Sequence, residues 1–181
     1  MEIQQAWLVK IHKNLLDQKN KIHKKDFRFF QIDILLELAR RTQVLSHKCD
    51  KCKQNKQIIE NLSLSAADKI DTIKGRNEIT KQIDAIIKHL KKDHKIYIKN
   101  YFIATYTFWG ILLGGILGYL TSLLFSQLTP ITGIMIGFII GLVVGRILGN
   151  YFEKKAHKEQ RLIKPQIISP LEEIINSQKT K

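Results

Sequence analysis

Residues 100–145 contain no Asp, Glu, Lys, Arg or His, although charged residues make up 25% of this chain of 181 residues. An uncharged stretch of this length excludes a single water-soluble globular domain. About 20 helical residues cross a hydrocarbon core of ~30 Å, so the stretch is long enough for two spans. Polar residues and a proline at 126–130 divide it, because Pro130 suits the first turn of a helix. We therefore predict transmembrane helices at about 102–125 and about 131–149.

The charges on either side of this stretch indicate the orientation of the two spans. Residues 1–100 carry 22 Lys and Arg against 12 Asp and Glu, and residues 146–181 carry 8 against 4, which together give the net charge of +14. Because the cytoplasmic flanks of membrane helices are enriched in Lys and Arg, we expect both termini in the cytoplasm, at the inner (plasma) membrane. Aromatic residues at the same ends of the spans are expected at the lipid interface: Tyr101, Phe102, Tyr106, Trp109, Tyr151 and Phe152.

Glycines recur at every fourth position in both predicted spans. They are Gly110, Gly114 and Gly118 in the first span and Gly133, Gly137, Gly141, Gly145 and Gly149 in the second. Residues four apart share one helix face, so a neighbouring backbone can approach each stripe closely. In this spacing the region resembles the glycine-zipper two-transmembrane proteins. The resemblance implies tight helix packing, suggests self-association and implies no enzymatic activity. Either the stripes only pack the two spans together, or part of them also mediates oligomerisation, including around a pore.

Residues 1–98 are predicted to form a helical cytoplasmic domain, because apolar residues recur at helical spacing and no stretch alternates with period two. Helices are expected at 4–20, from an N-cap at Asp26 through Leu45, at 51–62 before a linker at 63–67, and at 77–92. The last has the best-defined apolar face, formed by Ile79, Ile83, Ile86, Ile87 and Leu90.

The predicted fold class is an all-α membrane protein, with this helical domain followed by a transmembrane hairpin at residues 99–150. The basic tail, residues 151–181, is expected to continue the second span as a helix and to end in a short helix at 171–175.

Both cysteines of the chain and two of its six histidines have the spacing of metal ligands. Cys49 and Cys52 form Cys-x2-Cys, and after a gap of 36 residues His89 and His94 form His-x4-His. Thiolates and imidazoles in such pairs bind Zn²⁺ tetrahedrally, so we predict a structural zinc site. Four protein ligands leave no position for an activated water, and catalysis by this metal is not expected.

Alternatives to this site stay open at the level of sequence. On an unbroken helix His89 and His94 point about 140° apart, so the helix is expected to fray or end near Lys92 if both bind, with His47 as a substitute ligand. The cysteines could instead be ordinary thiols or a redox Cys-x-x-Cys, although the βαβ context of a thioredoxin-like motif is missing. The other histidines lack a companion pattern and are expected to be solvated: His12, His23 and His157.

No phosphate-binding loop, nucleophile elbow or His-Glu-x-x-His motif is present, so we predict no catalytic residues and no enzymatic activity. The densest basic run, at residues 19–28, is interpreted either as a face near an anionic membrane or as a nucleic-acid contact. The expected function is a non-enzymatic membrane anchor or scaffold whose zinc-stapled domain binds a cytosolic partner. The alternatives are an oligomerising, membrane-perturbing effector with a cytoplasmic sensor domain, and a membrane-tethered nucleic-acid binder.

Overall fold

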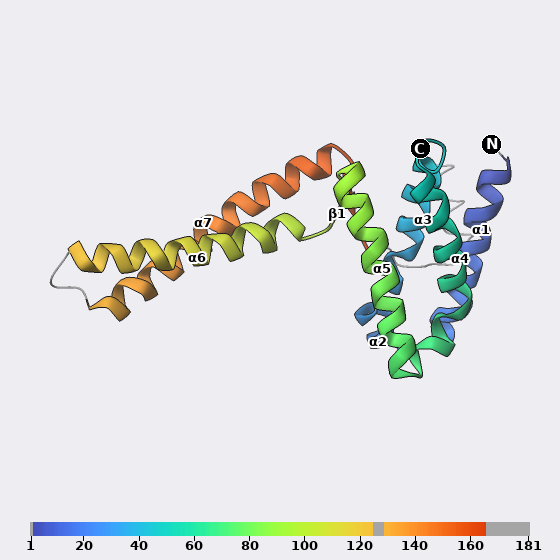
Figure 1. Ribbon diagram of the computed structural model, residues 1–181, viewed down its shortest axis with the longest axis horizontal. Coiled ribbons are helices and arrows are strands. Elements are labelled where there is room, and N and C mark those ends of the chain that lie inside the picture. Colours follow the sequence, from blue (N-terminus) through green and yellow to red (C-terminus); the bar gives the residue numbers. More distant parts are fainter. Residues whose placement is uncertain (1, 125–128, 166–181) are drawn as a thin grey trace, which may run out of the picture. The chain divides into compact units, whose positions relative to one another are not determined.

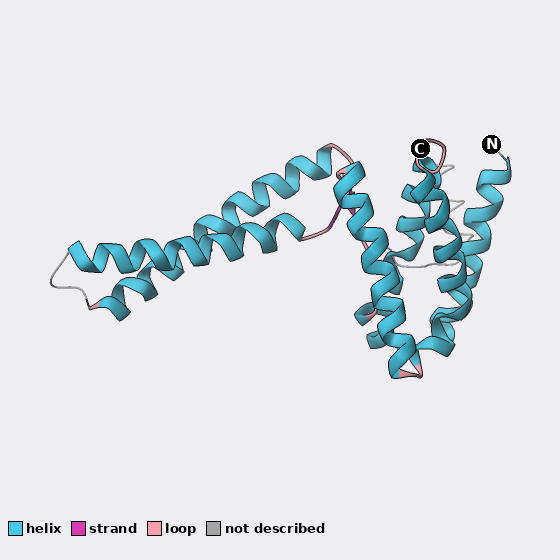
Figure 2. Cartoon of the chain, in the orientation of Figure 1, coloured by secondary structure: helices cyan, strands magenta, loops and turns pink. Residues whose placement is uncertain are grey.

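The computed structural model describes residues 2–124 and 129–165, and within them the fold is all-α (Figure 1 and Figure 2). The chain divides into two compact units. The first is a helical bundle formed by residues 2–95, and the second is a helical hairpin formed by residues 96–162. The predicted fold class is confirmed as far as an all-α chain with a hairpin of two long apolar helices. The predicted turn at 126–128, the predicted span end at Phe125 and the predicted helix at 171–175 lie outside the described residues.

The bundle consists of four longer helices and one short one. They are α1 (Glu2–Lys21), α2 (Lys24–Phe29), α3 (Leu35–Leu45), which follows the 3-10 turn η1 (Ile32–Ile34), α4 (Asp50–Ile70) and α5 (Ile73–His94). Helix α4 lies at the centre and contacts α1, α3 and α5. The core contains fully buried side chains from all four longer helices, among them Leu15, Leu38, Ile59, Leu62 and Ile83. Burying a side chain of this size contributes about 1.5–3 kcal/mol, so this core holds the helices together.

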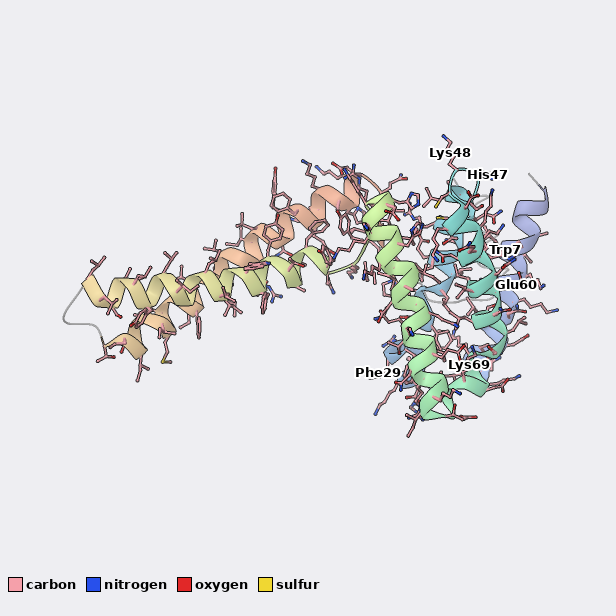
Figure 3. The ribbon with its side chains drawn as sticks, in the orientation of Figure 1. Trp7, Phe29, His47, Lys48, Glu60 and Lys69 are labelled. Atoms are coloured by element: carbon pink, nitrogen blue, oxygen red, sulfur yellow. The ribbon has the colours of Figure 1, made fainter. Side chains whose placement is uncertain are left out.

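Polar side chains connect α1 to α4 along their exposed edge. The indole Nε1 of Trp7 donates to Oε2 of Glu60 at 3.1 Å, and Nζ of Lys10 lies 2.6 Å from Oε1 of the same carboxylate. Figure 3 shows Trp7 and Glu60 side by side on the two helices. The bonds from Lys10 and Trp7 lower the pKa of Glu60. The carboxylate therefore stays ionised at neutral pH and fixes the N-terminal half of α1 on α4.

Helices α4 and α5 form an antiparallel pair. Thr72 caps the start of α5, where its hydroxyl accepts the backbone N–H of Gly75 at 3.1 Å, and Lys95, with a left-handed φ of 53°, follows its last residue. Cys49 caps the start of α4, where its sulfur accepts the backbone N–H of Cys52 at 3.4 Å. The antiparallel arrangement places the start of α4 beside the end of α5. Both predicted ligand pairs lie at this end of the bundle.

The linker predicted at residues 63–67 is wrong, because α4 continues through it. Ser63 is fully buried, and its hydroxyl donates to the carbonyl of Glu60 while accepting from the side chain of Asn14. Ser65 donates in the same way to the carbonyl of Asn61. Serine hydroxyls that bond back to the preceding turn stay compatible with a helix. Packing against α1 therefore overrides the loop preference of the sequence.

The single helix predicted from Asp26 to Leu45 is also wrong. Gln31 adopts a left-handed φ of 57°, which separates α2 from η1 and α3. His23, rather than Asp26, caps α2, because its Nδ1 accepts the backbone N–H of Lys25. His12, which the sequence placed in solvent, is only 4% exposed.

The hairpin is formed by α6 (Tyr101–Leu124) and α7 (Pro130–Lys158), which pack along their lengths. Both are long and apolar enough to cross a membrane, and only 17% of each apolar window is buried. Helix α7 passes the predicted end of the second span at 149 and ends in basic residues, as expected for the start of the tail. Thr129 caps it, and Pro130 occupies its first turn as predicted.

The glycines of both stripes lie in the contact between α6 and α7. We call them the glycine seam: Gly110, Gly114, Gly118, Gly133, Gly137, Gly141, Gly145 and Gly149. A Cβ added at any of these positions would collide with the backbone of the opposite helix. Close approach of two backbones requires residues without side chains. The stripes therefore pack the two helices of one chain on each other, as the first interpretation of the sequence predicted.

The end of the hairpin opposite its turn is held together by hydrogen bonds and aromatic rings. The strands β1 (Tyr97–Ile98) and β2 (Leu162–Ile163) pair beside this end, and the side chain of Glu153 accepts the backbone N–H of Asn100 just before α6. The rings of Tyr106 and Phe152 stack with centroids 4.8 Å apart. Aromatic residues from both helices thus meet at this end of the hairpin.

Candidate metal centre

Four side chains from two helices converge at one end of the bundle. Cys49 and Cys52 come from the first turn of α4, and His89 and His94 come from the last two turns of α5. Their ligand atoms all lie within 4.8 Å of one another. The structure therefore brings together all four residues that the sequence selected, in a group that can hold a metal ion.

The sulfurs face the Nε2 atoms of both imidazoles. Nε2 of His89 lies 3.3 Å from the sulfur of Cys49 and 3.3 Å from that of Cys52. Nε2 of His94 lies 3.4 Å from the sulfur of Cys52. Cys52 is fully buried and the other three are partly exposed, so the centre lies at the edge of the core.

Asp93 orients one of the two imidazoles. Its Oδ2 lies 2.7 Å from Nδ1 of His89, one helical turn away along α5. A carboxylate at this distance accepts the Nδ1–H, which leaves the lone pair on Nε2 directed at the sulfurs. Metal-bound histidines are typically held by such a partner. The sequence analysis did not select Asp93, although its spacing of four residues from His89 would have indicated it.

The environment of Cys52 keeps its thiol protonated in the absence of a cation. Burial, together with the neighbouring sulfur of Cys49 and the charge of Asp93, raises the pKa of the Cys52 thiol to about 12. A buried thiol of this kind becomes a thiolate when a cation replaces its proton, which is what a metal ion does.

Helix α5 ends two residues beyond the expected end near Lys92. The helix continues to His94, and the rings of His89 and His94 nevertheless meet edge to face with centroids 5.2 Å apart. Both imidazoles extend far enough from the backbone for their Nε2 atoms to reach the same sulfur, that of Cys52. His47, the predicted substitute, is not a member of the group of ligands.

Comparison with family models, curated proteins and solved structures gives no match to this chain. The resemblance to glycine-zipper two-transmembrane proteins stays a prediction.

Proposed function

We propose that the chain is an integral inner-membrane protein, with both termini in the cytoplasm, that anchors a zinc-stapled helical domain at the membrane and presents it to a cytosolic partner. It performs no catalysis itself. The observation that carries the proposal is the surface of the hairpin. Its apolar side chains point outward while its glycines occupy the contact between the helices.

The exposed side chains of the hairpin are those of a lipid-facing surface. Leu117, Leu123, Ile131 and Ile139 are each 61–72% exposed in the folded chain. The core helix of a soluble protein would bury most of such a face, whereas these windows are only 17% buried. Exposed apolar area costs about 25 cal/mol per Å² in water, and a bilayer removes that cost. The basic residues on both outer flanks favour a cytoplasmic position for the termini.

Zinc is the metal that suits the donor set of the candidate metal centre. In a tetrahedral site with Zn–S of about 2.3 Å and Zn–N of about 2.05 Å, sulfur and nitrogen ligands lie ~3.6 Å apart. The sulfur to nitrogen distances of 3.3 and 3.4 Å are close to that value. Two cysteines and two histidines complete the coordination of Zn²⁺, so the metal acts as a structural cross-link between α4 and α5.

Accessibility in intact cells tests the membrane topology. The chain should stay in the membrane after alkaline carbonate extraction, and a Gln127→Cys variant should react with an impermeant thiol reagent from outside. A Lys13→Cys variant, with the new thiol in α1, should react only after the cells are opened. Reaction of the α1 variant in intact cells, or release by carbonate, would contradict the proposal. Growth arrest with loss of membrane potential on overexpression would instead support the membrane-perturbing effector.

A further inference from the structure

One end of the bundle carries a dense group of exposed basic residues around an exposed aromatic ring. We call this group the basic tip: Lys21, Lys24, Lys25, Arg28 and Phe29. All five are exposed, and Phe29 is 78% exposed. Within residues 19–28 there are five Lys and Arg and a single acidic residue. The function proposed above makes no use of this group.

The fold places the basic tip at the end of the bundle opposite the candidate metal centre. The side chain of Gln18 bonds the carbonyl of Leu64 at 2.8 Å and the N–H of Ala67 at 2.7 Å, which fixes the end of α1 beside the end of α4. The two cysteines of the candidate metal centre lie at the start of α4, and that helix is 21 residues, or ~32 Å, long. Figure 3 shows Phe29 at the same end as Lys69, with Lys48 at the other end.

The short helix α2 is held so that its polar and aromatic residues face outward together. Phe27, 6% exposed, and Ile32, fully buried, attach it to the core. Phe29 lies two residues beyond Phe27, about 200° around the helix, and therefore points away from the core. A second large apolar side chain, Ile73, is 79% exposed at the turn between α4 and α5, the same end of the bundle.

We propose that the basic tip docks on an anionic lipid surface. Lys and Arg are attracted to acidic headgroups, and an aromatic ring among them can enter the headgroup boundary, which is the chemistry of interfacial membrane binding. Nucleic acid is the other polyanion that this charge would attract. An aromatic ring can stack on a base, but an aliphatic side chain such as Ile73 has no flat face for stacking, so the observations favour lipid. The proposal rests on the membrane insertion proposed above.

The test uses the full chain in nanodiscs of phosphatidylcholine, so that its own lipids offer the tip no negative charge. Sedimentation with separate vesicles then measures binding. Discs should bind vesicles that contain phosphatidylglycerol, bind pure phosphatidylcholine vesicles far more weakly, and lose binding as salt rises. Each Lys or Arg contributes about fivefold to such binding, so replacing Lys24, Lys25 and Arg28 together by Gln should weaken it by on the order of a hundredfold. Phe29→Ser should weaken it by roughly tenfold.

Matched controls separate the tip from net charge and from hydrophobicity in general. Replacing Lys13, Lys81 and Lys88 by Gln removes the same charge from exposed positions outside the tip, and Val44→Ser removes a side chain that is 73% exposed on α3. Both controls should keep most of the binding, and circular dichroism should show that all variants stay helical.

Three results would overturn the proposal. The first is that the discs show no preference for anionic vesicles, and the second is that the tip and control variants lose vesicle binding equally. The third is that the discs do not bind vesicles but retain polyuridylate through the tip, which would assign the tip to nucleic acid. Failure of the chain to resist carbonate extraction or to enter nanodiscs counts against the proposed function. Nanodiscs that form but do not bind count against the tip alone.

Discussion

Removing the candidate metal ligand Cys52 should uncouple the end of α5 from the start of α4. Cys52 is fully buried, and its sulfur is within 3.4 Å of one Nε2 atom of each imidazole. Cys52→Ser keeps the size and shape of the side chain but replaces the thiolate by a hydroxyl, a much poorer ligand for Zn²⁺. The substitution therefore tests the metal with little change in packing.

The size of the effect follows from linkage between binding and folding. A ligand that binds only the folded state stabilises it by about 2.7 kcal/mol at a free concentration 100 times its Kd. The bundle has about 95 residues, and in a domain of that size 1 kcal/mol shifts Tm by roughly 4–8 °C. Loss of the metal should therefore lower the Tm of the bundle by on the order of 10–20 °C. The apolar core remains, so the bundle should still fold without metal.

The measurement uses the full chain in detergent, prepared under reducing conditions, in a Trp109→Phe background so that Trp7 alone reports the bundle. Elemental analysis should find close to one zinc per chain, and a chelator should lower the midpoint of the Trp7 transition. The Cys52→Ser variant should lack zinc and should no longer respond to the chelator. A His23→Gln variant, which removes an exposed histidine at the opposite end of the bundle, should keep both the zinc and the response.

Two results would refute this reasoning. If protein prepared without any chelator contains no zinc, the chain has no zinc site, and the cysteines are ordinary thiols. Equal chelator responses in wild type and Cys52→Ser would show that the chelator acts elsewhere. A chain that binds zinc but whose Tm does not depend on it would leave a binding site with no structural role.

Three further predictions concern other parts of the chain. Asp93→Asn should weaken zinc affinity about 10–100-fold in a competition titration without unfolding the bundle, because the imidazole loses its orienting carboxylate; unchanged affinity would contradict that role. Gly141→Leu should destabilise the hairpin in detergent by at least about 1–3 kcal/mol, whereas Val143→Leu, at a half-exposed position, should have little effect; equal effects would exclude the glycine seam as the contact. The ion-paired Glu60 has a pKa below its ordinary value of 4.5. The stability that its carboxylate adds is therefore present above pH 4.5 and is lost as the pH falls through the lowered pKa. Thermal melts followed by Trp7 fluorescence should show this loss in wild type and not in Glu60→Gln.

The hairpin was the part of the fold that the sequence predicted best. Its signal is the absence of charged residues from a long stretch, to which every residue of the stretch contributes. A single Lys or Asp at the centre of either span would have removed the prediction. The bounds of α7 were harder to predict from the sequence. Helix α7 continues to Lys158 through residues that are polar enough to lie outside a membrane, so the end of the apolar stretch does not mark the end of the helix.

The bundle was harder to predict, because its breaks and continuities depend on tertiary contacts. Gln31 is neither Gly nor Asn, so its left-handed φ has no local signal. The serines at 63 and 65 resemble a linker, and only their bonds to the preceding turn and the packing of α1 keep them helical. In both places the local conformation is determined less by the neighbouring residues in sequence than by the helices packed against them.

The candidate metal ligands were predictable because Cys-x2-Cys and His-x4-His are local spacings. Their convergence was not, since it requires α4 and α5 to be antiparallel and to differ little in length. A 21-residue and a 22-residue helix joined by a tight turn bring their far ends together. The estimate of 140° between His89 and His94 was correct for the backbone but ignored the reach of the side chains, whose rings lie 5.2 Å apart.

The glycine seam limits how copies of this chain can associate. Each of its glycines already faces the backbone of the opposite helix, so a second copy could use the stripe only after α6 and α7 separate. Self-association of the closed hairpin would instead use its outer face, where Phe108, Leu112 and Phe138 line an apolar groove. Lipid chains compete for that face on nearly equal terms, because a bilayer is as apolar as the side chains themselves. Crosslinks between copies should therefore form at outward positions such as Leu112 rather than at Gly141. Crosslinks at the seam in an intact hairpin would show that the closed arrangement is not the one present in the membrane.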